Sequence, residues 1–440
     1  MTSPYIANND QDRQAMLGEI GVTSVEELFI DIPPSQRQAN FRLPPALSEA
    51  ELVRELNELA ASNAHQGRYS CFLGAGSYRH FIPGVVTNLI GRSEFLTPYT
   101  PYQAEVSQGT LQAIYEYQSL VCQLTGMGVS NAGMYDGATA LAEAALMACR
   151  ITGRKVVAIL SGVNPAYQEV VRTYSQGLGI TPAIVEAKAL SLGPDHACLL
   201  VQNPDFFGCL ERLEDYAQLA HAAGALLVVV VDPISLGLLK PPGEAGADIV
   251  VAEGQPLGIP PSFGGPSLGI FACREEYLRH MPGRIVGQTV DMDGETGYVL
   301  TLQTREQHIR RERATSNICT NSAWLALAAT IYLAALGKQG LKELSQLCYH
   351  KAHYAAARIS RLKGYSLVFD RPFFKEFAIR CPVAPSYINR RLLERGIIGG
   401  LDLSPTVENG MLLCVTELHT RGDIDRLVGE LEAIGSEVPA

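Results

Sequence analysis

One loop of the chain has the residue types that a phosphate-binding site needs. Two glycines, an asparagine and an aspartate lie in Asn131–Gly137, and the alanine-rich stretch Ala138–Glu143 follows at once. A helix N-terminus presents free N–H groups and the positive end of the helix dipole, so this junction and the hydroxyl of Thr139 could hold an anion. The same residues fit equally well an ordinary junction between a loop and a helix that packs closely on a sheet.

A second candidate is Asp232, which directly follows the apolar run Leu226–Val231. A carboxylate at the carboxyl end of a parallel strand lies where α/β sheets bind their ligands. In pyridoxal-phosphate enzymes of this architecture, such a carboxylate pairs with the pyridine nitrogen of the cofactor. The dipeptide Asp232–Pro233 also fits a simple turn, so this feature alone leaves both interpretations open.

A pyridoxal-phosphate enzyme also needs a lysine that forms a Schiff base, and we expect it just after the next strand, Asp248–Ala252. Residues 253–266 contain no lysine, and the chain has none between Lys240 and Lys338. The setting of Lys240, Leu-Leu-Lys-Pro-Pro, is typical of a solvated loop. An autonomous pyridoxal enzyme that uses Lys240 therefore remains only an alternative.

Two further segments are rich in polar and aromatic side chains, a composition typical of loops that line a site or an interface. Arginine forks beside hydroxyl groups could bind a carboxylate. The alternatives are a capped helix start at the surface for the first segment and a salt-bridged helix face for the second. The candidate residues are Tyr99, Tyr102, Gln103, Glu105 and Ser107 in the first segment, and Arg311, Arg313, Thr315, Ser316 and Asn317 in the second.

Two other features are weaker. The loop Gly74–Ser77 resembles a phosphate loop, but tight-turn or interface packing explains it better because no strand and helix flank it. The nine histidines show no spacing typical of a metal site, so we predict no metal.

The elements that must position these residues follow from the apolar pattern between residues 130 and 275. Short, continuously apolar runs alternate with helical stretches, which predicts strands buried on both faces in a mostly parallel α/β sheet, with helices on both of its faces. The predicted strands are Val156–Leu160, Thr181–Val185, Cys198–Gln202, Ala225–Val231, Asp248–Ala252 and Leu268–Cys273.

The remainder of the chain divides into an arm and a small domain. A capping-box pair, Ser48 and Glu51, predicts a helix within an N-terminal helical arm. A long helical zone is expected at 315–336 and 341–362, and the pattern after it is α+β. We therefore predict an arm at 1–65, a large α/β domain at 66–339 and a small α+β domain at 340–440.

Composition excludes several classes of protein. The 440 residues are 47% hydrophobic, and 35 basic against 45 acidic residues give a net charge of −10, which disfavours binding to nucleic acid. Ten cysteines without a C-x-x-C pair favour a reducing compartment. We see neither a signal peptide nor an apolar run of about 18–20 residues, so we expect a cytoplasmic protein with no membrane partner.

Several segments resemble one known family, the P-protein of the glycine cleavage system, and more narrowly its first, or alpha, subunit in organisms that divide the P-protein into two chains. The resemblance runs over nearly the whole chain. It is carried by Ser70–Pro83 (SCFLGAGSYRHFIP), Tyr99–Gly109 (YTPYQAEVSQG), Asn203–Gly208 (NPDFFG), Ala247–Gly265 and Arg313–Thr320 (RATSNICT). It implies a type I pyridoxal-phosphate-dependent transferase fold. It also implies decarboxylation of glycine, transfer of the aminomethyl group to the lipoyl arm of H-protein, and release of carbon dioxide.

The resemblance also implies how the work is divided between two chains. The cofactor lysine belongs to subunit 2, in agreement with Gln255 or Pro256 standing near the expected lysine position. Thr139, Asn203 and Asp232 would then be vestigial cofactor contacts. The polar candidates would line the partner's active site or the interface of an α2β2 assembly. The alternative is a non-catalytic scaffold or regulatory partner with a degenerate pyridoxal-enzyme fold.

Overall fold

The computed structural model describes residues 5–37, 43–96, 100–320 and 322–437. The chain divides into two compact units, Met1–Asn63 and Ala64–Ala440. The predicted domain boundaries at 65 and 339 remain predictions. None of the helices in the described ranges is long and apolar enough to cross a membrane. All ten cysteines are free thiols.

The first unit is built from short helices, and among its described hydrophobic residues only Leu17 is buried. Ser48 caps the last of these helices, and the predicted capping box with Glu51 is present. Apolar side chains on that helix, such as Leu56 and Leu59, are exposed. The helices are α1 (Asp10–Ile20), α2 (Pro34–Arg37) and α3 (Glu49–Ala61).

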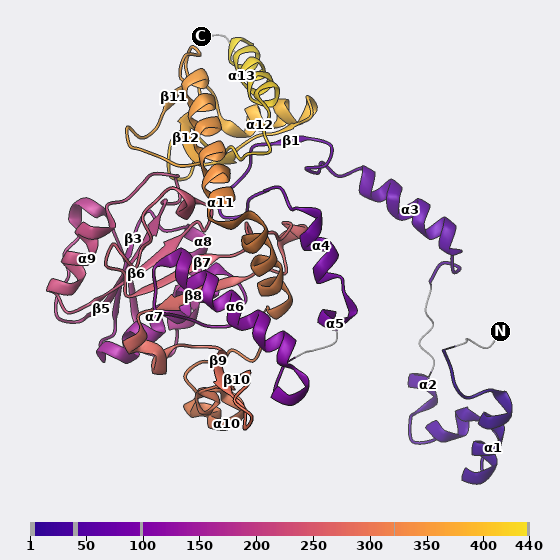
Figure 1. The fold of residues 1–440 in the computed structure, drawn as a ribbon. Helices are drawn as coiled ribbons and strands as arrows, with labels where there is room; N and C mark the ends of the chain where they lie inside the picture. Colours follow the sequence, from indigo (N-terminus) through magenta and orange to yellow (C-terminus); the bar gives the residue numbers. More distant parts are fainter. Residues whose placement is uncertain (1–4, 38–42, 97–99, 321, 438–440) are drawn as a thin grey trace. The chain divides into compact units, whose positions relative to one another are not determined.

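The second unit contains a seven-stranded sheet with the strand order β2-β8-β7-β6-β5-β3-β4 (Figure 1). Strands β3 to β7 run parallel to one another, whereas β8 runs antiparallel to both of its neighbours. The bounds are β2 (Val129–Ser130), β3 (Val156–Leu160), β4 (Thr181–Val185), β5 (His196–Asn203), β6 (Leu226–Val231), β7 (Ile249–Glu253) and β8 (Gly269–Cys273). The mostly parallel sheet predicted from the apolar runs is confirmed.

Helices cover both faces of this sheet, because continuously apolar strands must be buried on both sides. Tyr117 and Val121 of α6 and Ala217 of α9 belong to the core on one face. Leu141 of α7 and Val171 of α8 belong to the core on the other face. These helices are α6 (Gln108–Thr125), α7 (Gly137–Thr152), α8 (Pro165–Ser175) and α9 (Leu213–Ala222), with α4 (Gly84–Ile90) and α5 (Ser93–Leu96) preceding them.

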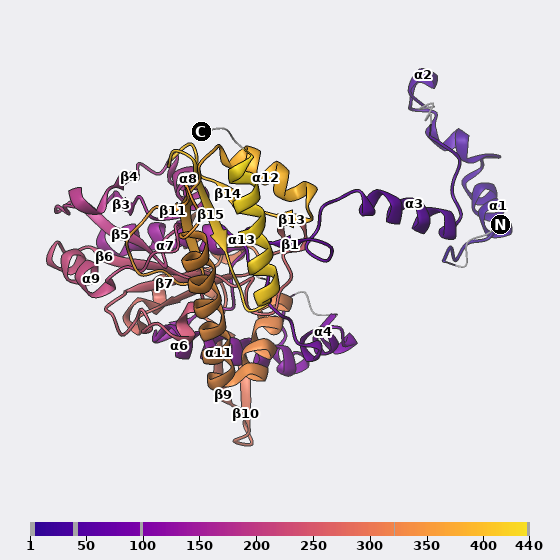
Figure 2. The same ribbon diagram turned by 90° about the horizontal axis from the view of Figure 1, so that it is seen from above.

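The C-terminal part forms a separate core around a four-stranded antiparallel sheet with the order β11-β12-β15-β14 (Figure 2). The helix α11 (Ala323–Ile359) contributes to both the large and the small core, and it is interrupted at Gly337. The remaining elements are β1 (Ser70–Cys71), which pairs with β13 (Ile397–Ile398), together with β11 (Ser366–Leu367), β12 (Glu376–Arg380), α12 (Pro385–Glu394), β14 (Leu401–Asp402), β15 (Gly410–Cys414) and α13 (Arg421–Ser436).

Two parts of the sequence prediction need correction. The helical zone does not begin at Thr315, because residues 315–320 are not helical and α11 begins at Ala323. The hydroxyl of Ser316 accepts the N–H of Ile318 and so competes with helix formation. An antiparallel hairpin also precedes this segment without having been predicted. It consists of β9 (Ile285–Val290) and β10 (Thr296–Thr301), and α10 (Gln307–Arg310) follows it.

Candidate functional site

The carboxyl ends of the parallel strands bring several polar residues to one edge of the sheet. Asp232 follows β6, Glu253 ends β7, and Gly137 begins α7 at the same edge. This is the edge at which open α/β sheets bind ligands. Two further segments complete the site, one around Tyr78 and the other around Lys375, just before β12 of the small sheet.

Lys375 lies at the centre of this site. Its Nζ is 2.8 Å from Asp232 Oδ2 and 3.1 Å from His80 Nε2, and it stands 3.6 Å from the centroid of the Tyr78 ring. The side chain is only 2% exposed. Burial is the largest single influence on the pKa of this lysine and lowers it, but the carboxylate of Asp232 and the nearby Cys414 and Cys348 together raise the pKa above its ordinary value. The amine is therefore held as an ammonium ion, which is not a nucleophile.

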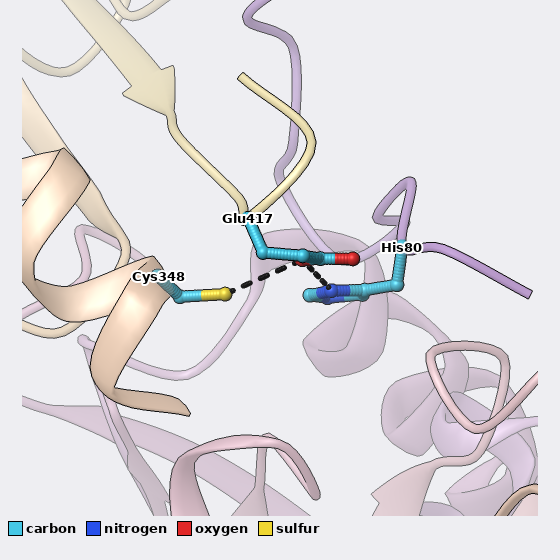
Figure 3. A group of neighbouring side chains, drawn as sticks. All are labelled: His80, Cys348 and Glu417. Carbon is cyan, nitrogen blue, oxygen red and sulfur yellow. Dashed lines mark hydrogen bonds and ion pairs between the residues drawn. The ribbon is translucent and has the colours of Figure 1, made fainter. Parts of the chain in front are cut away.

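The contacts of Lys375 continue through a buried chain of side chains (Figure 3). His80 Nδ1 lies 2.7 Å from Glu417 Oε2, and the thiol of Cys348 donates to the same oxygen over 3.5 Å. Burial, followed by the nearby ammonium of Lys375, lowers the pKa of His80. A neutral His80 can donate from Nδ1 to Glu417 and accept at Nε2 from Lys375.

His80, Cys348 and Glu417 offer three potential metal ligands whose atoms lie within 4.8 Å of one another. Two observations favour a hydrogen-bonded chain over a metal site. Burial raises the pKa of the Cys348 thiol, whereas a metal ligand must be a thiolate. The positive charge of Lys375 also lies next to His80, where it would repel a cation. We therefore assign no metal to this group.

Glu376, the neighbour of Lys375, closes the side of the site that faces the loop Gly74–Ser77. Its Oε2 accepts the hydroxyl of Tyr78 at 2.6 Å, and its Oε1 accepts the N–H of Ala75 at 2.6 Å. Burial raises the pKa of Glu376 to about 7. The loop interpreted from sequence as tight packing is therefore a wall of the candidate site.

Gln255 stands near the position where the sequence argument expects a cofactor lysine. Its Oε1 accepts the N–H of Tyr78 at 2.8 Å. Its Nε2 donates to the carbonyls of Tyr78 at 2.8 Å and of Ile259 at 2.7 Å. All of the side chain's hydrogen bonds are made to the backbone, so it fastens the loop after β7 to the loop around Tyr78.

Carboxylates of the chain itself occupy the N-terminus of α7. Glu253 Oε2 accepts the N–H of Gly137 at 3.0 Å, and Glu253 Oε1 accepts the N–H of Gln255 at 2.8 Å and the hydroxyl of Ser267. Asp136 accepts both the N–H of Thr139, at 2.7 Å, and its hydroxyl, at 2.9 Å. The hydroxyl of Thr139 thus serves the cap of its own helix.

The other two proposed vestigial contacts differ in position. Asp232 lines the site, where it binds Lys375 and accepts the N–H of Ile234 at 3.0 Å. Asn203 ends β5, and its side-chain oxygen accepts the N–H of Glu211 at 3.0 Å. Asn203 therefore holds the loop that follows its own strand.

The space enclosed by these residues is too small for a cofactor. The cavity between Asp232, Glu253 and Lys375 has a volume of about 30 Å³. Sites for small organic molecules have volumes of roughly 300–1,000 Å³. A space of 30 Å³ is on the scale of one water molecule. The residues present therefore do not fit pyridoxal phosphate.

The first polar segment contacts Arg284, next to β9, and His308 of α10. The guanidinium of Arg284 donates to the hydroxyl of Tyr102 over 3.2 Å, and the imidazole of His308 lies edge-on to the Tyr102 ring at 5.8 Å. Gln108 joins the end of the first segment to the hairpin through the N–H and the carbonyl of Tyr298, at 2.8 and 2.9 Å. Arg284 and His308 were not predicted as site residues, because isolated residues in segments without a recognisable pattern give no signal in the sequence.

A cavity of about 800 Å³ lies beside the second polar segment, and Thr315, Ser316 and Asn317 line it together with Thr139. The Ser316 hydroxyl donates to Glu143 Oε1 at 2.6 Å. The remaining candidates are more peripheral. Those exposed to solvent are Gln103, Glu105, Arg311 and Arg313, Ser107 is half-buried before α6, and Tyr99 lies outside the described residues.

Comparison with known proteins gives a consistent result. Residues 3–431 match the family model described as "Glycine cleavage system P-protein". A protein of Thermomicrobium roseum, named "Probable glycine dehydrogenase (decarboxylating) subunit 1", is 57% identical, and the match covers 98% of each chain. A protein of Desulfitobacterium hafniense with the same name is 55% identical over 98% of this chain and 99% of its own length.

Solved structures agree with the sequence relatives. The crystal structure of the glycine decarboxylase (P-protein) of the glycine cleavage system, in inhibitor-bound form, is 43% identical with a TM-score of 0.92, and covers 98% of this chain and 100% of that one. A sphingosine-1-phosphate lyase of Burkholderia pseudomallei, 14% identical with a TM-score of 0.64 over 92% and 95% of the two chains, shares the fold alone. The predicted pyridoxal-phosphate-dependent type I fold is thereby confirmed. The chain belongs to the glycine cleavage system P-protein family, among the relatives that are named subunit 1.

Proposed function

We propose that this subunit 1 acts with a lysine-bearing subunit 2, which holds pyridoxal phosphate, in the decarboxylation of glycine. The aminomethyl group passes to the lipoyl arm of H-protein, and carbon dioxide is released. The observation that carries this division of work is Gln255, which stands after β7 where a cofactor lysine is expected. Its side chain makes all of its hydrogen bonds to the backbone. When bound, pyridoxal phosphate supplies the electron sink for the carbanion that decarboxylation leaves.

The contribution of this chain is to complete the partner's site within an α2β2 assembly. Tyr102, with the exposed Arg311 and Arg313, offers hydroxyl and guanidinium groups that could orient a carboxylate such as that of glycine. The cavity beside Ser316 adds polar surface in the same region. With its ten free cysteines, the protein suits the reducing cytoplasm, where we place it.

The first test asks whether this chain binds the cofactor covalently. The purified chain is mixed with pyridoxal phosphate, reduced with borohydride and analysed by intact mass, with purified subunit 2 treated in parallel. We expect a stoichiometric pyridoxyl-lysine adduct on subunit 2 and none above background on this chain. Glycine-dependent carbon dioxide exchange should appear only when both chains and H-protein are present.

A stoichiometric adduct on this chain would contradict the proposal and make the chain an enzyme in its own right. Peptide mapping would then decide between its lysines. Lys240 is 51% exposed and bound to Glu214 at 3.1 Å, so its solvated setting agrees with the sequence interpretation.

A further inference from the structure

An acidic and a basic side chain, Glu253 and Lys375, stand at the two ends of the closed site. We propose that Glu253 and Lys375 replace the charges of the cofactor that this fold otherwise binds there, so that the chain closes its own site without a ligand. Glu253 takes the place of an anionic phosphate group, and the ammonium of Lys375 takes the place of a protonated ring nitrogen. The inference rests on the proposed function in one respect, namely that the cofactor belongs to subunit 2.

The replacement of the phosphate by Glu253, at the anionic end of the site, is inferred from the geometry at the start of α7. A helix N-terminus stabilises negative charge, and phosphates bind there for that reason. Here the carboxylate of Glu253 accepts the N–H of Gly137 and is anchored on its other oxygen by Gln255 and Ser267. A methyl group on Gly137 would stand 2.7 Å from the Tyr167 hydroxyl and 2.8 Å from the Glu253 nitrogen. The site around the helix end is therefore filled by the chain itself.

The replacement of the ring nitrogen by Lys375, at the cationic end of the site, is inferred from the position of Asp232. Its carboxylate is 11% exposed at the end of β6, where an unpaired charge would be costly. In a pyridoxal enzyme the cofactor ring supplies the positive partner. Here Lys375 supplies it at 2.8 Å, and His80 and the ring of Tyr78 hold the ammonium group in place.

The two replacements come from different parts of the fold. Glu253 belongs to the large sheet, whereas Lys375 and Glu376 lead into β12 of the small sheet. The contact of Asp232 with Lys375 therefore joins the end of β6 to the start of β12, and the contact of Tyr78 with Glu376 joins the loop around Tyr78 to β12. The chain should reach its final fold with no cofactor present.

The test of the cationic end uses thermal unfolding of the full chain. Lys375→Met should lower Tm by several degrees, because it leaves the carboxylate of Asp232 buried and unpaired. Lys375→Met/Asp232→Asn should recover at least half of that loss, because neither charge remains. Lys240→Met, which removes an exposed lysine paired with Glu214, is the matched control and should leave Tm unchanged.

The outcomes are distinct for these variants. A Tm of Lys375→Met equal to that of Lys240→Met would overturn the proposal. If Lys375→Met does not fold, the double variant still decides the question. Its folding supports the proposal, and its failure to fold shows that packing rather than charge replacement is the role of Lys375.

The test of the anionic end uses inorganic phosphate as the probe. Glu253→Ala opens the start of α7, so phosphate should raise its Tm with increasing concentration relative to chloride at equal ionic strength. The wild-type chain and Glu253→Gln, which keeps the side chain in place, should not respond. An equal response of all three proteins would overturn the anionic half of the proposal. If Glu253→Ala does not fold without phosphate, refolding that requires phosphate supports it, and no refolding in either salt overturns it.

These measurements separate the present inference from the proposed function. An adduct at a lysine other than Lys375 in the borohydride experiment would contradict only the division of work between subunits. An adduct at Lys375 would contradict both proposals. Unchanged stability of Lys375→Met, with no adduct, would contradict only the charge replacement.

Discussion

At the scale of single residues, the most informative group is the carboxyl of Glu376, because its burial in the fold disfavours the ionised form. Glu376 is fully surrounded by protein, and its hydrogen bonds to Tyr78 and Ala75 only partly offset the cost of burying its charge. Its pKa is raised to about 7 in the folded chain, from an ordinary value of 4.5. Folding therefore favours the protonated acid, which links the stability of the chain to pH.

The prediction from this residue is a pH profile. The raised pKa of this carboxyl adds about 3 kcal/mol to the free energy of unfolding at low pH. This stabilisation is fully present below about pH 4.5 and is lost as the pH rises to about 7. The glutamine of Glu376→Gln does not titrate. The free energy of unfolding of this variant, relative to that of the wild type, should therefore rise by this amount between pH 4.5 and pH 7.5. Urea unfolding at a series of pH values measures the difference, and Glu58→Gln on the exposed face of α3 is the control. A constant difference across this range would contradict the prediction.

The central residues of the site were only partly accessible from sequence. Asp232 was found because it ends a strongly apolar run, and the missing lysine after β7 was found by position. Lys375 and Glu376 were missed because more than 140 residues separate Lys375 from Asp232 along the chain. A signal was nonetheless present, since the pair interrupts the apolar stretch Phe373-Phe374-Lys375-Glu376-Phe377, and charges inside such a strand need buried partners.

At the scale of elements, continuous apolar character was a reliable guide. The bounds of β3 and β4 match the predicted strands, because the runs are bounded by polar or helical residues. The hairpin of β9 and β10 was missed, because its strands are partly exposed and show no continuous apolar run. The segment 315–320 was wrongly joined to a helix, because side-chain hydrogen bonds such as that of Ser316 are not visible in composition.

One element contains a specific backbone requirement. Gly337 interrupts α11 with φ 61° and ψ −177°, a conformation that is essentially confined to glycine. No atom lies within 4 Å of the position where a side chain would begin, so a substitution meets strain in the backbone and no steric clash. Gly337→Ala should therefore lower the free energy of unfolding by about 1–3 kcal/mol.

A second glycine provides the matched control for this prediction. Gly429 lies on the exposed side of α13 in helical conformation, also with no atom within 4 Å. Gly429→Ala should raise the free energy of unfolding by about 1 kcal/mol, because alanine is the better helix former. Chemical unfolding of both variants checks the pair, and equal effects of the same sign would show that the break in α11 is not under backbone control.

At the scale of the whole molecule, the exposed side chains of Tyr102 and Arg313 should matter chiefly in the assembly with subunit 2. The Arg313 side chain is 81% exposed, and its ion pair with Glu312 is long, at 4.0 Å. Arg313→Ala should therefore leave the Tm of the isolated chain unchanged. Tyr102→Phe should lower the Tm slightly, because it removes an acceptor of the buried Arg284 guanidinium. With subunit 2 and H-protein present, each should lower the kcat/KM of glycine-dependent carbon dioxide exchange about tenfold or more, because a charged or hydrogen-bonded substrate contact is lost.

Arg212 offers the control for these two variants, since its side chain is 87% exposed and pairs with Asp215 at 3.3 Å on α9. Arg212→Ala should change neither Tm nor the exchange rate. If Tyr102→Phe and Arg313→Ala also leave the rate of carbon dioxide exchange unchanged, these two residues do not contact the substrate. The interpretation of the chain as a scaffold for subunit 2 would then gain support.

The filled site beside Asp232 has an optical consequence. A chain that provides its own charges at Glu253 and Lys375 needs no vitamin B6 derivative to mature. Preparations of it should therefore be colourless, even from cells supplied generously with the vitamin. Any yellow colour in the reconstituted complex would then come from cofactor bound to subunit 2 alone. The visible absorbance would therefore measure the number of copies of subunit 2 in the assembly.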